Sequence, residues 1–217
     1  EYIKANTSVT VLYSGEGADE ASGSYLYFQN APSLEEFQTE ASRLLEDLQY
    51  FDVLRSDKSV FGCGLEVRVP FLDKDFINYY MRIPPEYKES KNQMEKEVLR
   101  KAFSDNWLPD KVLWRRKEAF SDGCSSQERS WSTVIQEYVN DKITDEDSTV
   151  LQQRWKHNPP QLKESMYYRM IFEELYPNCD HTIPYYWLPK WSGEEADPSA
   201  RELSNYDTTT SMNKKTK

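Results

Sequence analysis

The sequence has few of the residues from which disulfide frameworks and histidine metal sites are built. Its 217 residues include three cysteines, Cys63, Cys124 and Cys179, which are odd in number, widely spaced and without a CxxC pair. Only two histidines, His157 and His181, are present. These shortages argue against a disulfide-stapled secreted domain and against a histidine-rich metal centre. We therefore expect a reduced protein of the cytoplasm.

Long apolar runs and an excess of positive charge are missing as well. No segment approaches the ~18 apolar residues of a membrane span, and no signal-peptide pattern opens the chain. The formal net charge is −10, so the phosphates of a nucleic acid would be repelled by this surface. We expect neither a membrane nor a nucleic acid as a partner. The length suits one domain with its own core.

Glycine is scarce, and its distribution is informative. Six of the seven glycines lie in or beside three segments, residues 14–23, 62–73 and 114–123, whereas Gly193 lies elsewhere. Glycine permits unusual turns and lets a ligand approach the backbone closely. The three segments are therefore the candidates for a binding site.

The first segment follows an apolar run. Residues 9–13 break into Ser-Gly-Glu-Gly, which predicts a strand buried on both faces that ends in a loop, where ligands of open α/β sheets bind. Ser14 and Gly15 offer backbone N–H groups and a hydroxyl to an anion. Glu16, Asp19 and Glu20 add three carboxylates, which suit a divalent cation or an amine. A tight turn into an acidic helix start is the structural alternative.

The second segment places a charged pair beside apolar residues. Alternation over residues 65–71 puts Glu66 and Arg68 on the same side of a second, weaker strand candidate. For Arg68 we favour an ion pair, with Asp73 or with an acid of the first segment. Glu66 is a weaker candidate for contact with a substrate amine or with a lysine.

The third segment contains three consecutive cations, Arg115, Arg116 and Lys117, in an acidic chain. The apolar pair Ala119 and Phe120 and the Ser-Asp-Gly turn predicted at 121–123 would hold this loop against the body. The compact ammonium of Lys117 is suited to neutralise a departing pyrophosphate. A solvated basic patch, or ion pairs with the many acids, is the alternative.

Together the three segments resemble the glutamine-hydrolysing asparagine synthetases. Residues 14–20 (SGEGADE), 64–73 (GLEVRVPFLD) and 114–123 (WRRKEAFSDG) look like three successive signatures of that family, in its order. The similarity runs from about residue 8 to residue 206. That family has an N-terminal glutaminase domain and a C-terminal synthetase domain of the ATP-pyrophosphatase type. This chain resembles the later part of the second domain.

The resemblance implies an α/β parent protein, similar to the adenine-nucleotide α-hydrolases. Only one further strand candidate lies downstream, so we expect this chain to be mostly α-helical with one or two strands and the remaining sheet to lie upstream. The family's pyrophosphate loop, of the Ser-Gly-Gly-x-Asp-Ser type, does not occur in the sequence. We expect residues 1–191 to be a C-terminal part of the synthetase domain, and residues 192–217 to be a polar tail that is disordered after Tyr206.

The resemblance also implies a reaction and a set of site residues. The β-carboxylate of aspartate would attack Mg-ATP to give β-aspartyl-AMP and pyrophosphate, and ammonia from glutamine would then displace AMP to give asparagine. Ser14 and Gly15 would contact the nucleotide, and Asp19 would act through Mg²⁺ or the aspartate amine. Glu16 would be needed for the intermediate, and Lys117 would stabilise charge on pyrophosphate. ATP and Mg²⁺ would be the cofactors, the parent's glutaminase domain a partner, and a homodimer a further option.

Two alternatives stay open beside this interpretation. Related enzymes of the same fold adenylate other carboxylates or close β-lactam rings, although similarity continuing through residues 187–191 and 197–201 favours the asparagine enzyme. The chain could instead be a non-catalytic interaction fragment, because the phosphate loop is absent.

Capping residues and helical spacing predict the remaining elements. Ser33 and Glu36 have the spacing of a capping box, and Asp73 is placed to cap a later helix. Tyr25, Tyr27 and Phe28 are expected to be core or wall residues, with stacking of one of them on an adenine ring as the alternative. The charged face of the helix after Ser33 is expected to be solvated. We predict helices over residues 34–54, 74–83, 92–108, 126–139 and 162–176, an acidic loop over 140–148 and an irregular aromatic segment over 185–191.

Overall fold

The computed structural model describes residues 1–115, 117–126, 129–193, 203 and 206. The chain divides into two compact units, Glu1–Arg116 and Lys117–Lys217, each of which has its own packing. The described residues are mostly helical and contain two strands. The prediction of a mostly helical chain with one or two strands is confirmed.

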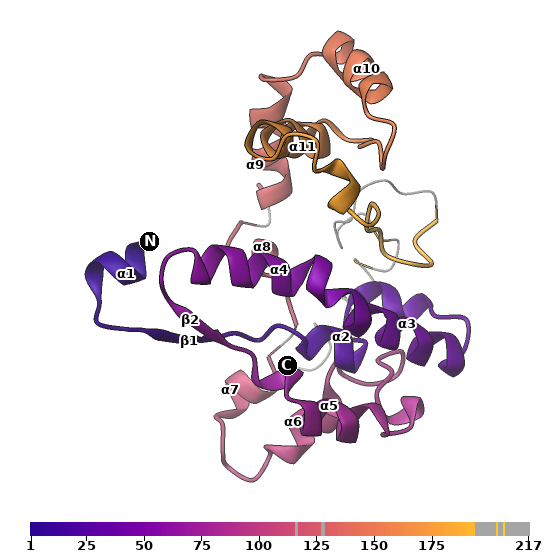
Figure 1. The fold of residues 1–217 in the computed structure, drawn as a ribbon. Helices are drawn as coiled ribbons and strands as arrows, with labels where there is room; N and C mark the ends of the chain where they lie inside the picture. The colour runs from indigo at the N-terminus through magenta and orange to yellow at the C-terminus, as the bar shows by residue number, and fades with distance from the viewer. Residues whose placement is uncertain (116, 127–128, 194–202, 204–205, 207–217) are drawn as a thin grey trace. The chain divides into compact units, whose positions relative to one another are not determined.

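The two strands lie side by side in unit 1 (Figure 1). β1 (Val11–Tyr13) and β2 (Glu66–Arg68) pair in parallel, with Leu12 opposite Val67. Parallel strands require a long crossover, and here the crossover is helical. The pairing brings the start of the first motif segment next to the second motif segment.

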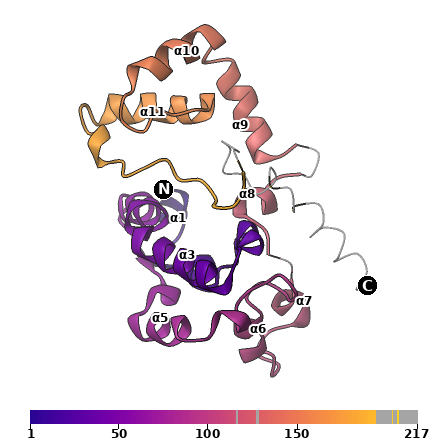
Figure 2. The same ribbon diagram turned by 90° about the vertical axis from the view of Figure 1, so that its right-hand side faces the viewer.

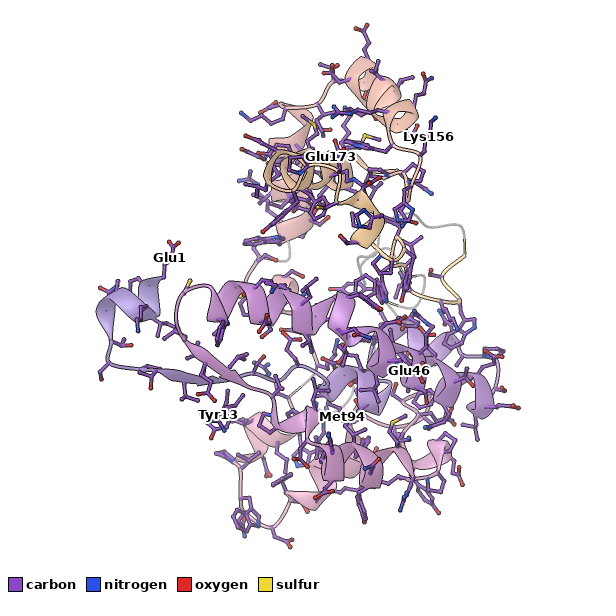
Figure 3. All side chains as sticks on the ribbon, viewed as in Figure 1. Glu1, Tyr13, Glu46, Met94, Lys156 and Glu173 are labelled. Carbon is purple, nitrogen blue, oxygen red and sulfur yellow. The ribbon has the colours of Figure 1, made fainter. Side chains whose placement is uncertain are left out.

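The prediction that the first strand is buried on both faces is wrong for this chain. The side chain of Tyr13, labelled in Figure 3, is 78% exposed, and that of Val11 is 37% exposed. A strand of a parallel sheet is covered only when neighbouring strands and helices supply both layers. Among the described residues, β1 has a single neighbouring strand.

The crossover consists of short helical pieces around one longer helix. It runs through α2 (Ala18–Ser22), η1 (Leu26–Asn30), α3 (Leu34–Asp47), η2 (Leu48–Tyr50), α4 (Asp52–Ser56) and the π-helical turn η3 (Asp57–Phe61). The predicted helix over 34–54 is interrupted because Phe51 leaves the helical region, with ψ −99°. The helix formed by α4 and η3 runs along the strand pair (Figure 1).

The core of unit 1 forms where α3 packs on the aromatic residues before it. Ser33 caps α3 by accepting a hydrogen bond from the Glu36 N–H, as predicted. The rings of Phe28 and Phe37, both buried, meet edge to face with centroids 5.1 Å apart. Tyr27 is also buried, so Tyr27 and Phe28 form core as expected, whereas Tyr25 is half-buried. Such an edge-to-face pair stabilises a core by about 0.5–1.5 kcal/mol beyond its area.

One charged residue of α3 contradicts the prediction of a solvated charged face. Glu40 is fully buried. Its carboxylate accepts hydrogen bonds from the Tyr27 hydroxyl at 2.9 Å and from the Arg43 guanidinium at 2.6 and 2.8 Å. Because a buried charge must be paired and hydrogen-bonded, these contacts explain how Glu40 is tolerated.

The segments after β2 complete unit 1 with short helices, of which α5 was predicted most closely. Asp73 caps α5 by accepting hydrogen bonds from the Asp75 and Phe76 N–H groups. The predicted start of the next helix at residue 92 is wrong, because α6 begins only after Lys96 adopts a left-handed conformation. The elements are η4 (Pro70–Leu72), α5 (Lys74–Met81), η5 (Pro85–Tyr87), α6 (Glu97–Ala102) and α7 (Asp110–Leu113), with α1 (Tyr2–Asn6) preceding β1.

A buried lysine lies between α3 and α5. Lys88 is 3% exposed, and its ammonium donates to Gln38 Oε1 at 2.7 Å and lies 5.8 Å from the centre of the Tyr80 ring. Burial lowers the pKa of Lys88 to about 8. Removing an ammonium from water is costly when a neutral amide is its acceptor, which explains the direction of this change.

Unit 2 is a helical unit (Figure 2). It contains α8 (Phe120–Gly123), α9 (Trp131–Asn140), α10 (Asp145–Arg154), α11 (Lys163–Leu175) and η6 (Asp180–Thr182). Its core consists of Val139, Ile143, Trp155 and Met166. Glu173 of α11, labelled in Figure 3, accepts from the Trp155 indole at 2.5 Å and pairs with Arg154 at 2.9 Å, which ties α11 to the end of α10.

Three predictions for unit 2 need correction and two are confirmed. The helix predicted from residue 126 begins at Trp131, because Ser130 is the residue that caps it. The predicted acidic loop over 140–148 contains the start of α10, which a reciprocal capping box of Thr144 and Asp147 stabilises. The predicted Ser-Asp-Gly turn at 121–123 is part of α8. The helix over 162–176 and the irregular segment over 185–191 are confirmed.

The prediction for the tail lies almost wholly outside the described residues, since only Leu203 and Tyr206 are described after residue 193. Across the described part of the chain, every helix is too short or too polar to cross a bilayer.

Candidate functional site

The acidic loop, residues 14–20, connects the end of β1 to α2 in unit 1 and includes the first turn of α2. Gly17 precedes α2 with φ +87°, a left-handed conformation that glycine adopts readily. A Cβ at this position would lie 2.1 Å from the Leu72 side chain. Gly17 is thus required both by its backbone conformation and by the close approach of η4. This turn fixes the direction in which α2 leaves the strand.

The structure changes how Ser14 and Gly15 are able to contact a nucleotide. The Ser14 N–H donates to the Arg68 carbonyl at 2.8 Å, so it belongs to the β-ladder and not to an anion cradle. The prediction that the Ser14 N–H binds an anion is therefore wrong. Contact between Ser14 and a nucleotide would have to be made by the hydroxyl. A Cβ on Gly15 would meet nothing within 4 Å, so open space borders that residue.

Glu16 is held by a pair of residues that sequence reasoning missed. Its Oε1 lies 3.1 Å from Arg55 Nη2, and the same guanidinium lies 2.8 Å from Asp52 Oδ1. Asp52 and Arg55 are one turn apart on α4, which runs beside the strand pair. An i,i+3 acid–base pair is common on helices, so the sequence alone gave no signal that this one reaches the loop.

Asp19 is also bound to a distant cation. Its Oδ1 lies 2.8 Å from Lys96 Nζ and accepts a short hydrogen bond from the Ser24 hydroxyl. The side chains of Asp19 and Lys96 are 28% and 19% exposed, so this ion pair is partly buried. Lys96 was not singled out from the sequence.

Glu20, the third acid, points into the protein. It is 3% exposed and accepts a short hydrogen bond from the Tyr25 hydroxyl. Burial raises the pKa of the Glu20 carboxyl above its ordinary value, and the hydrogen bond from Tyr25 opposes this only in part. The nearby carboxylates of Asp52 and Asp19 raise the pKa of Glu20 further. The three acids therefore differ: two are paired with cations and one is buried against a phenol.

The charged pair of the second segment is formed within β2. Glu66 and Arg68, both exposed, form a short ion pair with each other. The expected ion pair of Arg68 is present, but the expected partner is wrong, because residues two apart on a strand lie on the same face. Asp73 instead caps α5.

The cations of the third segment fall on the boundary between the units. Arg115 is exposed at the end of unit 1, Lys117 is the first residue of unit 2, and Arg116 lies outside the described residues. The resemblance implies that Glu16 and Lys117 face the same bound nucleotide, and this stays a prediction. Phe120, expected to hold this loop against the body, is 88% exposed.

The donor set of the loop fits a cation that is bound mainly through substrate oxygens. In the described part of the chain no three residues among histidine, cysteine, aspartate and glutamate gather in a metal-binding cluster. Magnesium in nucleotide sites is often held by one or two carboxylates together with phosphates and water. Asp19 supplies one carboxylate of that kind, with Lys96 as its existing counter-charge.

Comparison with known proteins identifies similar sequences. The family model described as asparagine synthase matches residues 29–201. Proteins named asparagine synthetase [glutamine-hydrolyzing] from Gallus gallus and Homo sapiens are 47% and 46% identical over 207 residues, which is 95% of this chain. The protein of the same name from Mus musculus is 46% identical over an equal length. The chain spans 37% of the length of each of these relatives.

Proposed function

Because the chain belongs to the asparagine synthase family, we propose that it supplies the acidic half of an ATP-dependent asparagine-forming site. The observation that carries the proposal is the placement of Glu16, Asp19 and Glu20 at the carboxyl end of a parallel strand, where α/β proteins bind ligands. A loop whose acids are individually held by other elements is preorganised, and preorganised charge is the main source of catalysis in such sites.

The reaction we propose has two steps. An oxygen of the aspartate β-carboxylate attacks the α-phosphorus of ATP, the bond from that phosphorus to the bridging oxygen breaks, and pyrophosphate leaves. The nitrogen of ammonia, which glutamine supplies, then attacks the β-carbonyl carbon of the adenylate, the bond to AMP breaks, and asparagine forms. No protein nucleophile is needed, so positioning and electrostatics carry the chemistry.

We assign a role to each candidate residue. Glu16 orients the acyl group or takes the proton that ammonia releases on attack, and Arg55 holds the Glu16 carboxylate in place. Ser14 contacts the nucleotide through its hydroxyl, and the backbone approaches it at Gly15, where space is open. Lys117 neutralises the leaving pyrophosphate.

Magnesium, when bound through the phosphates and Asp19, would neutralise charge on the triphosphate. Asp19 also suits the aspartate amine, since a carboxylate accepts hydrogen bonds from an ammonium. The Glu66–Arg68 pair supports the second motif segment beside β1. We further propose a glutaminase domain as the source of ammonia, a cytoplasmic location, and a homodimer as the assembly to test.

A chimera tests the proposal directly. Residues 8–206 replace the matching segment of the Gallus gallus relative, and aspartate-dependent exchange of pyrophosphate into ATP is measured. We expect exchange within about tenfold of the relative, and a loss of about 10²–10⁴-fold in Glu16→Ala, the size typical for a general acid–base residue. Glutaminase activity should be unchanged in both proteins and serves as the folding control.

Two results would contradict the proposal. Retained glutaminase without exchange would favour a non-catalytic interaction fragment, and exchange that requires a carboxylate other than aspartate would favour a related adenylating or β-lactam-forming enzyme. Unchanged exchange in Glu16→Ala would remove Glu16 from the mechanism.

A further inference from the structure

Lys96 holds the acidic loop from a segment that lies 77 residues downstream of Asp19. Its ammonium lies 2.8 Å from Asp19 Oδ1, the oxygen that also accepts from the Ser24 hydroxyl. Both charged side chains are partly buried, at 19% and 28% exposure. Solvent and salt screen such a pair less than an exposed one. By comparison Arg55, which holds Glu16, is 65% exposed.

The backbone at Lys96 is unusual for its residue type. Lys96 has φ +60° and ψ +27°, the left-handed conformation, immediately before α6. A residue other than glycine costs roughly 1–3 kcal/mol when it is held in such a conformation. The neighbouring Glu97 carboxylate accepts from the Met94 N–H, which fixes the turn from the other side. Glycine or asparagine would suit the backbone better, so the lysine side chain must account for the residue found here.

Electrostatics indicates what the side chain contributes. A triphosphate placed beside Asp19 would be repelled by an unpaired carboxylate, and Glu16 and Glu20 would add to that repulsion. An ammonium in contact with Asp19 neutralises one of these charges. It also fixes the start of α2, since Asp19 lies in its first turn.

We propose that Lys96 is a positioning residue, which holds Asp19 and the acidic loop in the arrangement that transfer of the adenylyl group requires. The proposal rests on the proposed function of the same site. In this role Lys96 acts through Asp19 and does not contact the substrate.

Hydrogen exchange on the full 217-residue chain tests the structural half of the proposal. Lys96→Asn removes the ammonium while keeping a residue that tolerates the left-handed backbone, and Lys96→Arg restores the charge. We expect amides of residues 17–24 to exchange about tenfold faster in Lys96→Asn than in the wild type, with protection restored to within about twofold in Lys96→Arg. Lys58→Gln is the matched control, because it breaks an exposed ion pair with Asp57 elsewhere in unit 1. Protection unchanged in Lys96→Asn would overturn the proposal.

The kinetics of the chimera tests the functional half. We expect Lys96→Asn to lower kcat for pyrophosphate exchange by about tenfold or more, with the KM for ATP changed by less than about threefold and substantial rescue by Lys96→Arg. A raised KM with unchanged kcat would show that Lys96 binds the substrate directly, which overturns a role through Asp19. If the unmutated chimera shows no exchange, the proposed function fails, whereas the hydrogen-exchange result still decides whether Lys96 holds the loop.

Discussion

Replacement of the buried Lys88 by methionine tests the electrostatics of unit 1. Methionine keeps the apolar stem and removes the ammonium, whose recorded contacts are Gln38 and the Tyr80 ring. The pKa of Lys88 is lowered from 10.5 to about 8 in the folded protein. Below pH 8 both the folded and the unfolded chain hold the proton. Between that pH and 10.5 the unfolded chain binds more protons, so the free energy of unfolding rises with pH.

The size of the effect follows from this difference in pKa. We compare the free energy of unfolding of the wild type with that of Lys88→Met. By linkage, the wild-type value minus the variant value should be about 2.5 kcal/mol larger at pH 10 than at pH 7. At pH 7 the ammonium is buried in its charged form, so we expect Lys88→Met to be as stable as wild type or more stable. With a urea m-value of about 1–3 kcal/mol/M, this change should alter the difference in unfolding midpoint between the two proteins by roughly 0.8–2.5 M.

Urea unfolding of both proteins at pH 7 and pH 10, followed by far-UV circular dichroism, measures this quantity. Other groups also titrate between pH 7 and pH 10, so the relevant quantity is the difference in free energy of unfolding between the two proteins. Lys58→Met is the matched control, because Lys58 is 75% exposed and its removal should leave the pH dependence unchanged. If the difference in free energy of unfolding between wild type and Lys88→Met stays constant within ~0.5 kcal/mol from pH 7 to pH 10, the pKa of Lys88 is not lowered by burial.

Three further predictions concern the core, the loop turn and the cationic segment. Glu40→Ala should lower the free energy of unfolding by roughly 2–4 kcal/mol, because it removes the acceptor of the buried Tyr27 hydroxyl and one of the two carboxylates that pair with Arg43. The exposed Glu35→Ala on the same helix should change it by less than ~0.5 kcal/mol. Gly17→Ala should lower the free energy of unfolding by roughly 2–4 kcal/mol, because of the positive φ and the clash with the Leu72 side chain of η4. Gly15→Ala is the control and should lower it by less than ~1 kcal/mol, because the added Cβ meets no atom within 4 Å. Equal melting temperatures of the two variants would contradict this prediction. Lys117→Ala should lower exchange in the chimera by about 100-fold or more with a loss of stability below ~1 kcal/mol. A large drop in its melting temperature would show Lys117 to be structural.

The sequence predicted those elements whose signals are local. Ser33 and Asp73 cap helices through bonds that span two or three residues, so their types and spacing were sufficient. The apolar spacing of α11 likewise predicted its bounds closely. By contrast α10 buries none of its residues and has little apolar periodicity, so only the Thr144–Asp147 spacing, a capping-box signal that was overlooked, marked its start.

The parts that could not be predicted depend on contacts between distant segments. The acids of the loop were found, but their partners Arg55 and Lys96 lie 39 and 77 residues further on and carry no local signal. The late start of α6 depends on the conformation of one residue, which propensity does not determine. Exposure of the first strand was missed because its apolar residues indicate burial only when all the layers of a sheet are present.

The hydrogen bond from the Ser14 amide to the Arg68 carbonyl has a consequence for how this region tolerates change. Because of this bond, the position of the acidic loop depends on the register in which β1 and β2 pair. Addition or deletion of a single residue between Gly64 and Arg68 would turn the exposed ion pair of β2 inward and shift Glu16 relative to Arg55. The same change near residues 104–108, outside both strands, would disturb no such alignment, and length variation among natural sequences should therefore concentrate there.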